Sequence, residues 1–399
     1  MRLSPPTLPA VKRKVALVAL AGALAALPAA PASAGAPGKG ESVQCGAIVK
    51  RDVRLTADLV DCPGDGLVVG RPNVSIDLNG HTIAGAFAGD GINNSRGFDR
   101  VEVLDGTITH FKNGVRLDRA AGNRLSGLTL SRNHQGMLLS ASPATIVNDG
   151  NVSYNGESMR VGDGIVVRDG SHGTQFARMF VHGNAAVGIS AFDSDRVRIV
   201  ASNMSNYAGG ILIVRSANSA VLDSTLQNAG TGVESVGARE LLVRGNVVAS
   251  GQASGVLLRG STGGRVEDNT IRGAINDGIA VSGDGNVVTA NRVLSSFSNG
   301  IAVYAGGDNA VTANEARALE DGIFVAAGVN GAYLAHNLAN GSNDDGIDVR
   351  TPSASLTDNT ANDNGDYGIE AVPGVTDGGG NRASGNGNPA QCLGFACTS

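Results

Sequence analysis

Short apolar runs of alternating character recur along most of the chain. Each run opens with a glycine followed by Ile, Val or Met, as in Gly-Ile-Ala-Val at 278–281 and Gly-Ile-Phe-Val at 322–325. Apolar residues at every second position are typical of a strand with one buried face. The thirteen glycines, 22 to 24 residues apart except for one step of 28, are Gly91, Gly114, Gly136, Gly164, Gly188, Gly210, Gly232, Gly255, Gly278, Gly300, Gly322, Gly346 and Gly368. We expect a strand after each of them.

An asparagine also recurs in register, after a second apolar run in each of the later repeats. These residues, again 22 or 23 apart, are Asn246, Asn269, Asn291, Asn314, Asn337 and Asn359. Asparagine tolerates left-handed backbone, and its amide can both donate and accept hydrogen bonds along a stack. We therefore expect a ladder of stacked asparagines at an inward turn.

The repeat length selects the fold. A period in this range that covers most of a chain means that each repeat is one coil of a stack. Helix-turn-helix repeats are longer, and leucine-rich repeats need leucines at fixed offsets that this chain lacks. A left-handed hexapeptide helix would need a six-residue period. The pattern predicts an all-β, single-domain, right-handed parallel β-helix of about 13 coils with capped ends.

The N-terminal residues have the character of a secretory signal peptide. A basic start precedes an apolar stretch over 15–30 and the small residues Ala32-Ser33-Ala34. The stretch is short for a transmembrane span, and no other segment approaches one. We divide the chain into a signal peptide at 1–34, an N-terminal cap and first coil at 35–85, β-helix repeats at 86–378 and a C-terminal cap at 379–399. The protein is expected to be secreted, either extracellular or in the cell envelope.

Two cysteines lie near each end of the exported part, at Cys45, Cys62, Cys392 and Cys397. An even count in an exported chain indicates disulfides. Pairing the first two and the last two is the most economical arrangement, because the ends of a rod are far apart. A zinc site is the weaker alternative for the same reason. Open solenoid ends expose unpaired strand edges, so we expect the bridges to staple the end caps.

The charge of the exported part is negative. Loss of residues 1–34 removes four of the 31 basic residues and no acidic one, which leaves 27 against 36 and a formal charge of −9. This charge argues against nucleic-acid binding and against an anionic membrane surface. The chain has no Trp, no lysine after Lys112, and six histidines without metal-ligand spacing. We expect a monomer.

Both ends of the repeat region resemble a known group of proteins. The segments Cys45-Gly46 to Leu67 and Val74 to Ile83, with the tail from Asp377 to Cys392, are similar to the ends of secreted bacterial right-handed parallel β-helix repeat proteins. These belong to the pectate-lyase-like superfamily, and the resemblance covers residues 45–397. The superfamily contains polysaccharide lyases, pectin hydrolases, uronate epimerases and NosD-like periplasmic proteins. The resemblance implies a polysaccharide partner, acidic polymers included, but the fold does not select an activity.

The densest acidic cluster is Asp344-Asp345-Gly346-Ile347-Asp348, and Asp321 falls in register with Asp345 one coil earlier. Like charges one rung apart are unfavourable unless a cation offsets them, and Ca²⁺ takes six to eight oxygen ligands. The run resembles the calcium-binding segment of one family of β-helix pectate lyases. That resemblance implies Ca²⁺ ligands at Asp344, Asp345 and Asp348, with Asp321 from the preceding coil. The alternative is that Asp before Gly simply starts a turn.

Catalytic candidates are few. The lyase family places a catalytic lysine just after a Gly-Phe at the start of a later strand, and the comparable position here holds Glu370. Arginine can replace lysine as the base, which leaves Arg350 and Glu370 as weak candidates. If Ile347 and Val349 point inward, Asp348 and Arg350 point outward on one face.

The same outward face carries Tyr304 and Phe324 on earlier coils, which with Arg350 form a candidate substrate-binding strip. The simpler interpretation of each arginine is a solvated surface charge.

Two functional hypotheses remain open. The first is an exported β-helix without catalysis that binds polysaccharide, or displays a surface toward it, at the cell envelope or outside it. The second is a calcium-dependent polysaccharide lyase or uronate epimerase with its site around Asp344–Asp348. The acidic cluster favours the second. The missing lysine, the absence of Trp and the low aromatic content of 4% favour the first.

Overall fold

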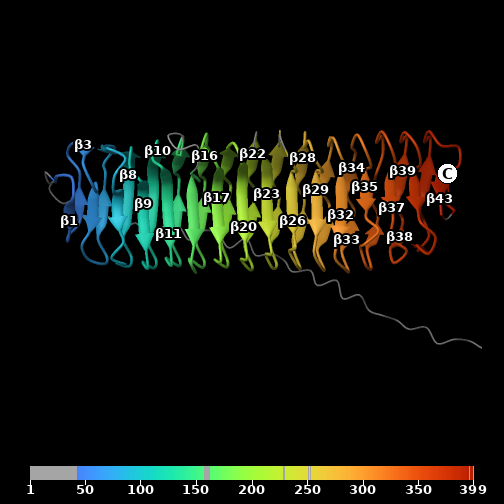
Figure 1. Ribbon diagram of the computed structural model, residues 1–399, viewed down its shortest axis with the longest axis horizontal. Coiled ribbons are helices and arrows are strands. Elements are labelled where there is room, and N and C mark those ends of the chain that lie inside the picture. Colours follow the sequence, from blue (N-terminus) through green and yellow to red (C-terminus); the bar gives the residue numbers. More distant parts are fainter. Residues whose placement is uncertain are drawn as a thin grey trace, which may run out of the picture. The chain divides into compact units, whose positions relative to one another are not determined.

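The computed structural model describes residues 43–156, 162–227, 230–249, 251, 253–394 and 396–398, all within one compact unit. These residues form 43 strands, and the pairings between strands are parallel (Figure 1). The described part contains no helix, and therefore none that is long and apolar enough to cross a membrane. The predicted all-β parallel β-helix is confirmed, whereas the predicted signal peptide at 1–34 lies outside the described residues.

The first sheet contains one strand from each successive coil. Within the described residues its sixteen strands, in spatial order, are β1 (Ala47–Val49), β4 (Leu67–Val69), β7 (Asp90–Asn94), β9 (Asn113–Asp118), β11 (Gln135–Ser140), β14 (Ile165–Arg168), β17 (Val187–Phe192), β20 (Gly209–Val214), β23 (Thr231–Val236), β26 (Val256–Arg259), β29 (Ile279–Ser282), β32 (Ile301–Ala305), β35 (Ile323–Val325), β37 (Ile347–Val349), β40 (Ile369–Ala371) and β43 (Cys392–Leu393). Thirteen of them contain or directly follow one of the recurring glycines. The other three lack a glycine followed by Ile, Val or Met, since β1 begins at Ala47 after Gly46, β4 begins at Leu67 after Gly66 and β43 begins after Gln391. The helix therefore has about 15 turns rather than the predicted 13.

Two further series of strands complete each turn. The second series is β2 (Val53–Arg54), β5 (Ser75–Asp77), β8 (Glu102–Thr109), β10 (Arg124–Ser131), β12 (Ile146–Asn148), β15 (Gln175–Ala177), β18 (Arg198–Val200), β21 (Ala220–Leu222), β24 (Leu242–Arg244), β27 (Arg265–Glu267), β30 (Val287–Thr289), β33 (Ala310–Thr312), β36 (Tyr333–Ala335), β38 (Ser355–Thr357) and β41 (Thr376–Asp377). The third series is β3 (Leu59–Cys62), β6 (Thr82–Gly85), β13 (Asn151–Ser153), β16 (Phe180–His182), β19 (Asn203–Ser205), β22 (Thr225–Gln227), β25 (Val247–Ala249), β28 (Thr270–Arg272), β31 (Arg292–Val293), β34 (Glu315–Ala316), β39 (Thr360–Asn362) and β42 (Arg382–Ser384). The long strands β8 and β10 pair within both series.

The recurring glycines are required by the contact between successive coils. A Cβ atom built on Gly300 would lie 2.5 Å from the carbonyl oxygen of Gly322, and one on Gly322 would lie 2.6 Å from that of Gly346. The same contact, at 2.5–2.7 Å, recurs from Gly91 to Gly346. These glycines do not have positive φ, so their role is close backbone approach rather than a left-handed turn.

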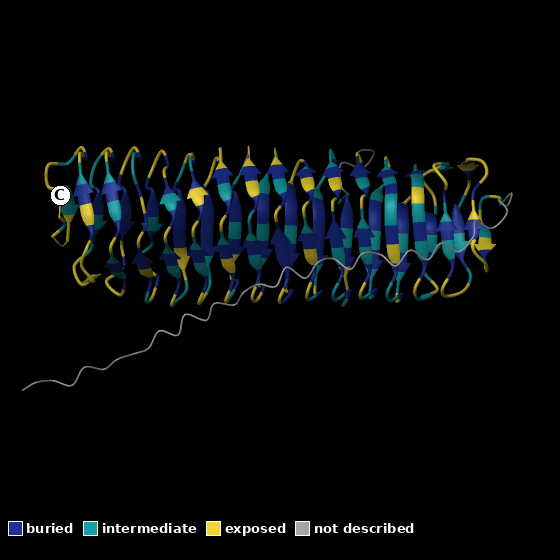
Figure 2. Cartoon of the chain, turned by 180° about the vertical axis from the view of Figure 1, so that it is seen from behind, coloured by how far each residue is buried: buried dark blue, intermediate teal, exposed yellow. Residues whose placement is uncertain are grey.

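The residue after each of these glycines fills the core. Ile279, Ile301, Ile323, Ile347 and Ile369 are fully buried, stacked in register on neighbouring strands. Figure 2 shows buried residues along the strands and exposed residues mainly at the turns. Each apolar side chain therefore contacts its equivalents one coil before and one coil after, which makes the core continuous.

The predicted asparagine ladder is confirmed. From Asn246 to Asn359, the Nδ2 atom of each asparagine donates to the Oδ1 atom of the next at 2.9–3.1 Å, and the ladder continues to Asn381. The left-handed residue of this turn is the one before each asparagine, such as Ala290 at φ 55° or Ala313 at φ 55°. The asparagine's own role is to satisfy buried amides between coils.

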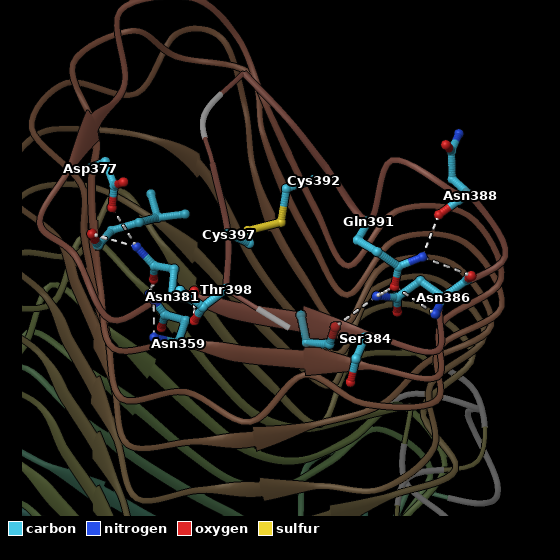
Figure 3. Close-up of a disulfide and its surroundings, with 12 residues drawn as sticks. Asn359, Asp377, Asn381, Ser384, Asn386, Asn388, Gln391, Cys392, Cys397 and Thr398 are labelled. Atoms are coloured by element: carbon cyan, nitrogen blue, oxygen red, sulfur yellow. Dashed lines mark hydrogen bonds between the residues drawn. A yellow bond between two sulfur atoms is a disulfide. The ribbon is translucent and has the colours of Figure 1, made fainter.

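Disulfides join the cysteines in the expected pairs, Cys45–Cys62 and Cys392–Cys397. The second bridge closes a short loop at the C-terminal end of the helix (Figure 3). Beside it the asparagine ladder ends on Asp377, whose Oδ1 accepts from Nδ2 of Asn381 at 2.9 Å. This end of the stack is therefore closed by side-chain hydrogen bonds as well as by a covalent link.

Candidate functional site

A column of buried polar residues precedes the glycines in the later coils. Its members are Asp277, Asn299, Asp321 and Asp345, each 4–6% exposed. The Oδ1 atom of each accepts the backbone N–H of the equivalent residue on the next coil, at 2.8–3.3 Å, and Tyr367 supplies the last of these donors. These hydrogen bonds agree with the interpretation that the residues start turns, but they occupy only one carboxylate oxygen of each aspartate.

The outward row of the first sheet carries charge next to the polar column. Phe324, Asp348 and Glu370 are direct neighbours on β35, β37 and β40. Asp348 lies in this outward row, as its position between inward residues predicted, yet it is only 2% exposed. Arg350 lies beside it: its Nε is 2.7 Å from Oδ2 of Asp348, and its guanidinium carbon lies 4.9 Å from the centre of the Phe324 ring.

Carboxylates converge on Asp345 from two sides. Oxygen atoms of Asp344, Asp345 and Asp366 lie within 4.8 Å of one another, and so do those of Asp345, Asp348 and Glu370. Either group could hold a hard cation, because carboxylate oxygens are the ligands that Ca²⁺ prefers. We call these two groups together the Asp345 cluster.

The Asp345 cluster differs from the predicted ligand set in two ways. Asp321 belongs to neither group, although its Oδ1 accepts the backbone N–H of Asp345 at 3.1 Å. Asp366 and Glu370 were not predicted as ligands. Each lies 22 residues after an acidic residue of the cluster, one coil further on, which is the signal that identifies them. Glu370, a predicted catalytic candidate, thus lies in the same cluster.

Burial raises the pKa values of two aspartates at this site. The pKa of Asp345 is raised to about 8, chiefly by burial and in part by its hydrogen bond with Glu370. Burial likewise raises the pKa of Asp321 to about 7, with the charges of Asp348 and Asp344 adding to the shift. At neutral pH the site therefore holds protons that free carboxyl groups would have released, and a bound cation would displace them.

We expect the stability of the cation-free protein to depend on pH through this cluster. Because the folded-state pKa of Asp345 lies above its unfolded value, the folded state binds more protons between about pH 4 and pH 8, and the free energy of unfolding falls as the pH rises through that window. The measurement is urea unfolding of the wild type and of Asp345→Asn from pH 5 to pH 8 with chelator. The wild type should lose stability relative to the variant, whereas a constant difference would contradict the pKa shift.

A β-bulge aims Tyr304 across the polar column. The register of the first sheet shifts between β29 and β32, so that Ser282 pairs with Ala305 and leaves Tyr304 unpaired. The Tyr304 hydroxyl donates to Oδ2 of Asp277, one coil earlier, at 2.9 Å. Bulges commonly re-aim side chains next to functional sites. Burial raises the pKa of Tyr304 to about 12, so this hydroxyl keeps its proton.

The predicted substrate-binding strip is brought together by this geometry. The ring centres of Tyr304 and Phe324 are 5.9 Å apart, and the guanidinium group of Arg350 lies over the Phe324 ring. Tyr304 is 43% exposed. The strip and the Asp345 cluster therefore occupy one continuous region, from β29 to β40 on the outward face of the first sheet.

The C-terminal third of the chain, which includes this region, carries the excess negative charge. Residues 268–399 contain five Lys or Arg and fifteen Asp or Glu, a net charge of −10, whereas residues 35–267 are close to neutral. The electric field of this negative charge attracts cations and repels anions that approach without a bound cation.

Two family profiles match parts of the chain, each over less than half of its length. Residues 160–306 match the family described as periplasmic copper-binding protein (NosD), and residues 254–394 match the right handed beta helix region. No curated protein is significantly similar to the chain in sequence.

Several solved structures share the architecture. The periplasmic alginate epimerase AlgG is 16% identical, with 72% of this chain and 76% of that chain covered and a TM-score of 0.49. The A-module of the Azotobacter vinelandii mannuronan C-5 epimerase AlgE6 is 15% identical, with coverages of 83% and 90% and a TM-score of 0.47. The Streptococcus pneumoniae surface protein and adhesin PfbA is 12% identical, with coverages of 76% and 91% and a TM-score of 0.46. Likeness at this level does not identify an activity.

The residues in the first matched segment do not fit copper. Copper sites use nitrogen and sulfur ligands. Met179 and Met204 lie in the core, His182 packs against two aromatic rings, and Nδ1 of His172 accepts a backbone N–H at 2.9 Å. Within the described residues, groups of three or more potential ligands consist of carboxylates alone. The donor set favours a hard cation.

Proposed function

We propose that this chain, a right-handed parallel β-helix protein, binds polysaccharide outside the cytoplasm through a divalent cation held by the Asp345 cluster. The observation that carries the proposal is the convergence of two three-carboxylate groups on one buried aspartate, on an otherwise regular sheet face. Two disulfides and the predicted signal peptide support the export of the protein.

The cluster leaves room for a ligand in the coordination sphere. Ca²⁺ takes six to eight oxygens, and each carboxylate group supplies three side chains, so sugar or water oxygens complete the shell. An acidic polymer fits best, because its carboxylates can share the cation with the protein. Arg350 adds a positive charge at the exposed side, and Tyr304 and Phe324 offer ring faces to the sugar.

Affinity electrophoresis tests the proposal. The protein is run through gels that contain polygalacturonate, alginate or a neutral glucan, with Ca²⁺ or with chelator. We expect retardation in the acidic polymers with Ca²⁺ and normal mobility with chelator. Equal mobility in every gel would overturn the proposed function, and retardation by the neutral glucan alone would overturn the role of the cation.

A second candidate, C5-proton chemistry on a uronate polymer, is favoured by the raised pKa of Asp345, whose carboxyl group is hydrogen-bonded to Glu370. A carboxyl group with a pKa of about 8 can give or accept a proton near neutral pH. Arg350 is the less suitable general base, because its hydrogen bond with Asp348 raises its pKa and keeps the guanidinium protonated. Absorbance of unsaturated uronate detects a lyase, and deuterium exchange at C5 followed by NMR detects an epimerase. If neither the absorbance nor the exchange is detected with polymers that bind, the protein binds polysaccharide without catalysing a reaction.

A further inference from the structure

Three large apolar side chains stand exposed in register beside the site. Ile275, Phe297 and Leu319 are 47%, 62% and 47% exposed. The backbone hydrogen bonds that place them on successive coils run from Phe297 N to Ala274 O and from Leu319 N to Ser296 O, both 2.9 Å. Each lies two residues before a member of the polar column. We call these three residues the apolar stripe.

The core does not account for the apolar stripe. The inward position of the same turn is filled by the small residues Ala274, Ser296 and Ala318, all buried. The large side chains that follow them are therefore left in water, on the turn that leads into the first sheet. Exposed apolar groups gathered in register indicate an interaction surface.

Polar groups run parallel to the apolar stripe at the same spacing. The next position outward holds Ser298 and Glu320, with the Ser298 hydroxyl donating to Oε2 of Glu320 at 2.8 Å. Beyond them lie the polar column and the hydroxyl of Tyr304. Successive coils of a parallel sheet are about 4.8 Å apart, which is close to the length of one sugar unit in an extended polysaccharide. Apolar platforms and hydrogen-bonding groups thus repeat once per sugar unit.

We propose that the apolar stripe is an axial sugar platform: a linear polysaccharide lies parallel to the helix axis, with one sugar ring on each of Ile275, Phe297 and Leu319, and runs on to the Asp345 cluster. This inference rests on the proposed function and specifies the orientation and length of its ligand. The track covers the coils of β29, β32, β35, β37 and β40, so full affinity requires about five sugar units. Three side chains are too few to bury the area of a stable protein–protein interface, which excludes a folded partner as the occupant.

The test is calorimetric titration of the full chain, in Ca²⁺, with unbranched oligogalacturonates and oligoguluronates from the dimer to the octamer. For the wild type we expect affinity to rise with length and then level off at about five units. Phe297→Ala should weaken the binding of the octamer about tenfold, because a stacked ring is lost, and should leave the shortest ligands that bind unchanged. Its thermal unfolding should match the wild type, because Phe297 is exposed.

Tyr207→Ala is the matched control. Tyr207 occupies the same position of its coil, three coils before Ile275, and is 72% exposed. If the wild type binds the octamer and both variants bind it equally well, the axial platform is wrong while the proposed function stands. If the wild type binds no oligouronate, the proposed function fails and the platform with it. A loss confined to Phe297→Ala supports the platform.

Discussion

Replacing Gly300 with alanine is expected to lower the free energy of unfolding by about 2–3 kcal/mol. The new Cβ atom would lie 2.5 Å from the carbonyl oxygen of Gly322, whereas its nearest side-chain neighbour, Ala316, would be 3.2 Å away. Because the obstacle is backbone of the next coil, a change of rotamer cannot relieve it, and the two coils must separate. The midpoint of urea unfolding, followed by circular dichroism, measures the loss.

Gly328→Ala provides the matched control. A Cβ atom at Gly328 meets nothing within 4 Å, and its φ is not in the left-handed region. This variant should unfold within about 0.5 kcal/mol of the wild type. If both variants are equally stable, close packing of coil on coil is not the reason for the recurring glycines.

The substitution Asp345→Asn is expected to abolish any stabilisation of the protein by Ca²⁺. In the wild type a cation at a hundred times its dissociation constant should add about 2.7 kcal/mol to the free energy of unfolding. Asp345 is the one residue shared by both carboxylate groups, so Asp345→Asn damages both. Without cation at pH 8 the variant should be at least as stable as the wild type, because one buried like charge has been removed. Thermal unfolding with Ca²⁺ and with chelator measures both effects.

Asp277→Asn is the control for this experiment. Asp277 belongs to the same polar column, is equally buried and accepts the equivalent backbone hydrogen bond, but lies in neither carboxylate group. It should keep the Ca²⁺ response of the wild type. A Ca²⁺ response that survives in Asp345→Asn, or that disappears in both variants, would show that the cluster is not the cation site. If the wild type shows no response to Ca²⁺, the acidic residues of the cluster only form turns and bind no cation.

The fold could be predicted from the sequence because the repeat places the same residue type in the same environment once per coil. The recurring Gly-Ile pair located all thirteen repeat strands of the first sheet. The end strands β1 and β43 escaped, because residues there contact only one neighbouring coil and need not follow the pattern. β4 escaped because its glycine, Gly66, is followed by Leu67 rather than by Ile, Val or Met. The asparagine ladder was predicted from the spacing of the asparagines and the hydrogen-bonding capacity of their amides, whereas the left-handed residue before each asparagine was not predicted.

The candidate site was predicted only in part, since its contacts connect different coils. Asp344, Asp345 and Asp348 are close in sequence, and their clustering was visible there. Asp366 and Glu370 join them only through the register of the next coil. The Tyr304–Asp277 hydrogen bond depends on a β-bulge, for which the sequence around β32 carries no signal that we recognise.

The uneven charge along the chain has a kinetic consequence. With a net charge of −10 in residues 268–399, a polyanion that reaches this region before a cation is repelled, and one that arrives after the cation is not. Under the proposed function, encounter is therefore ordered, with the cation first and the polymer second. Salt that screens the repulsion also weakens the attraction for the cation, so association should be fastest at an intermediate ionic strength.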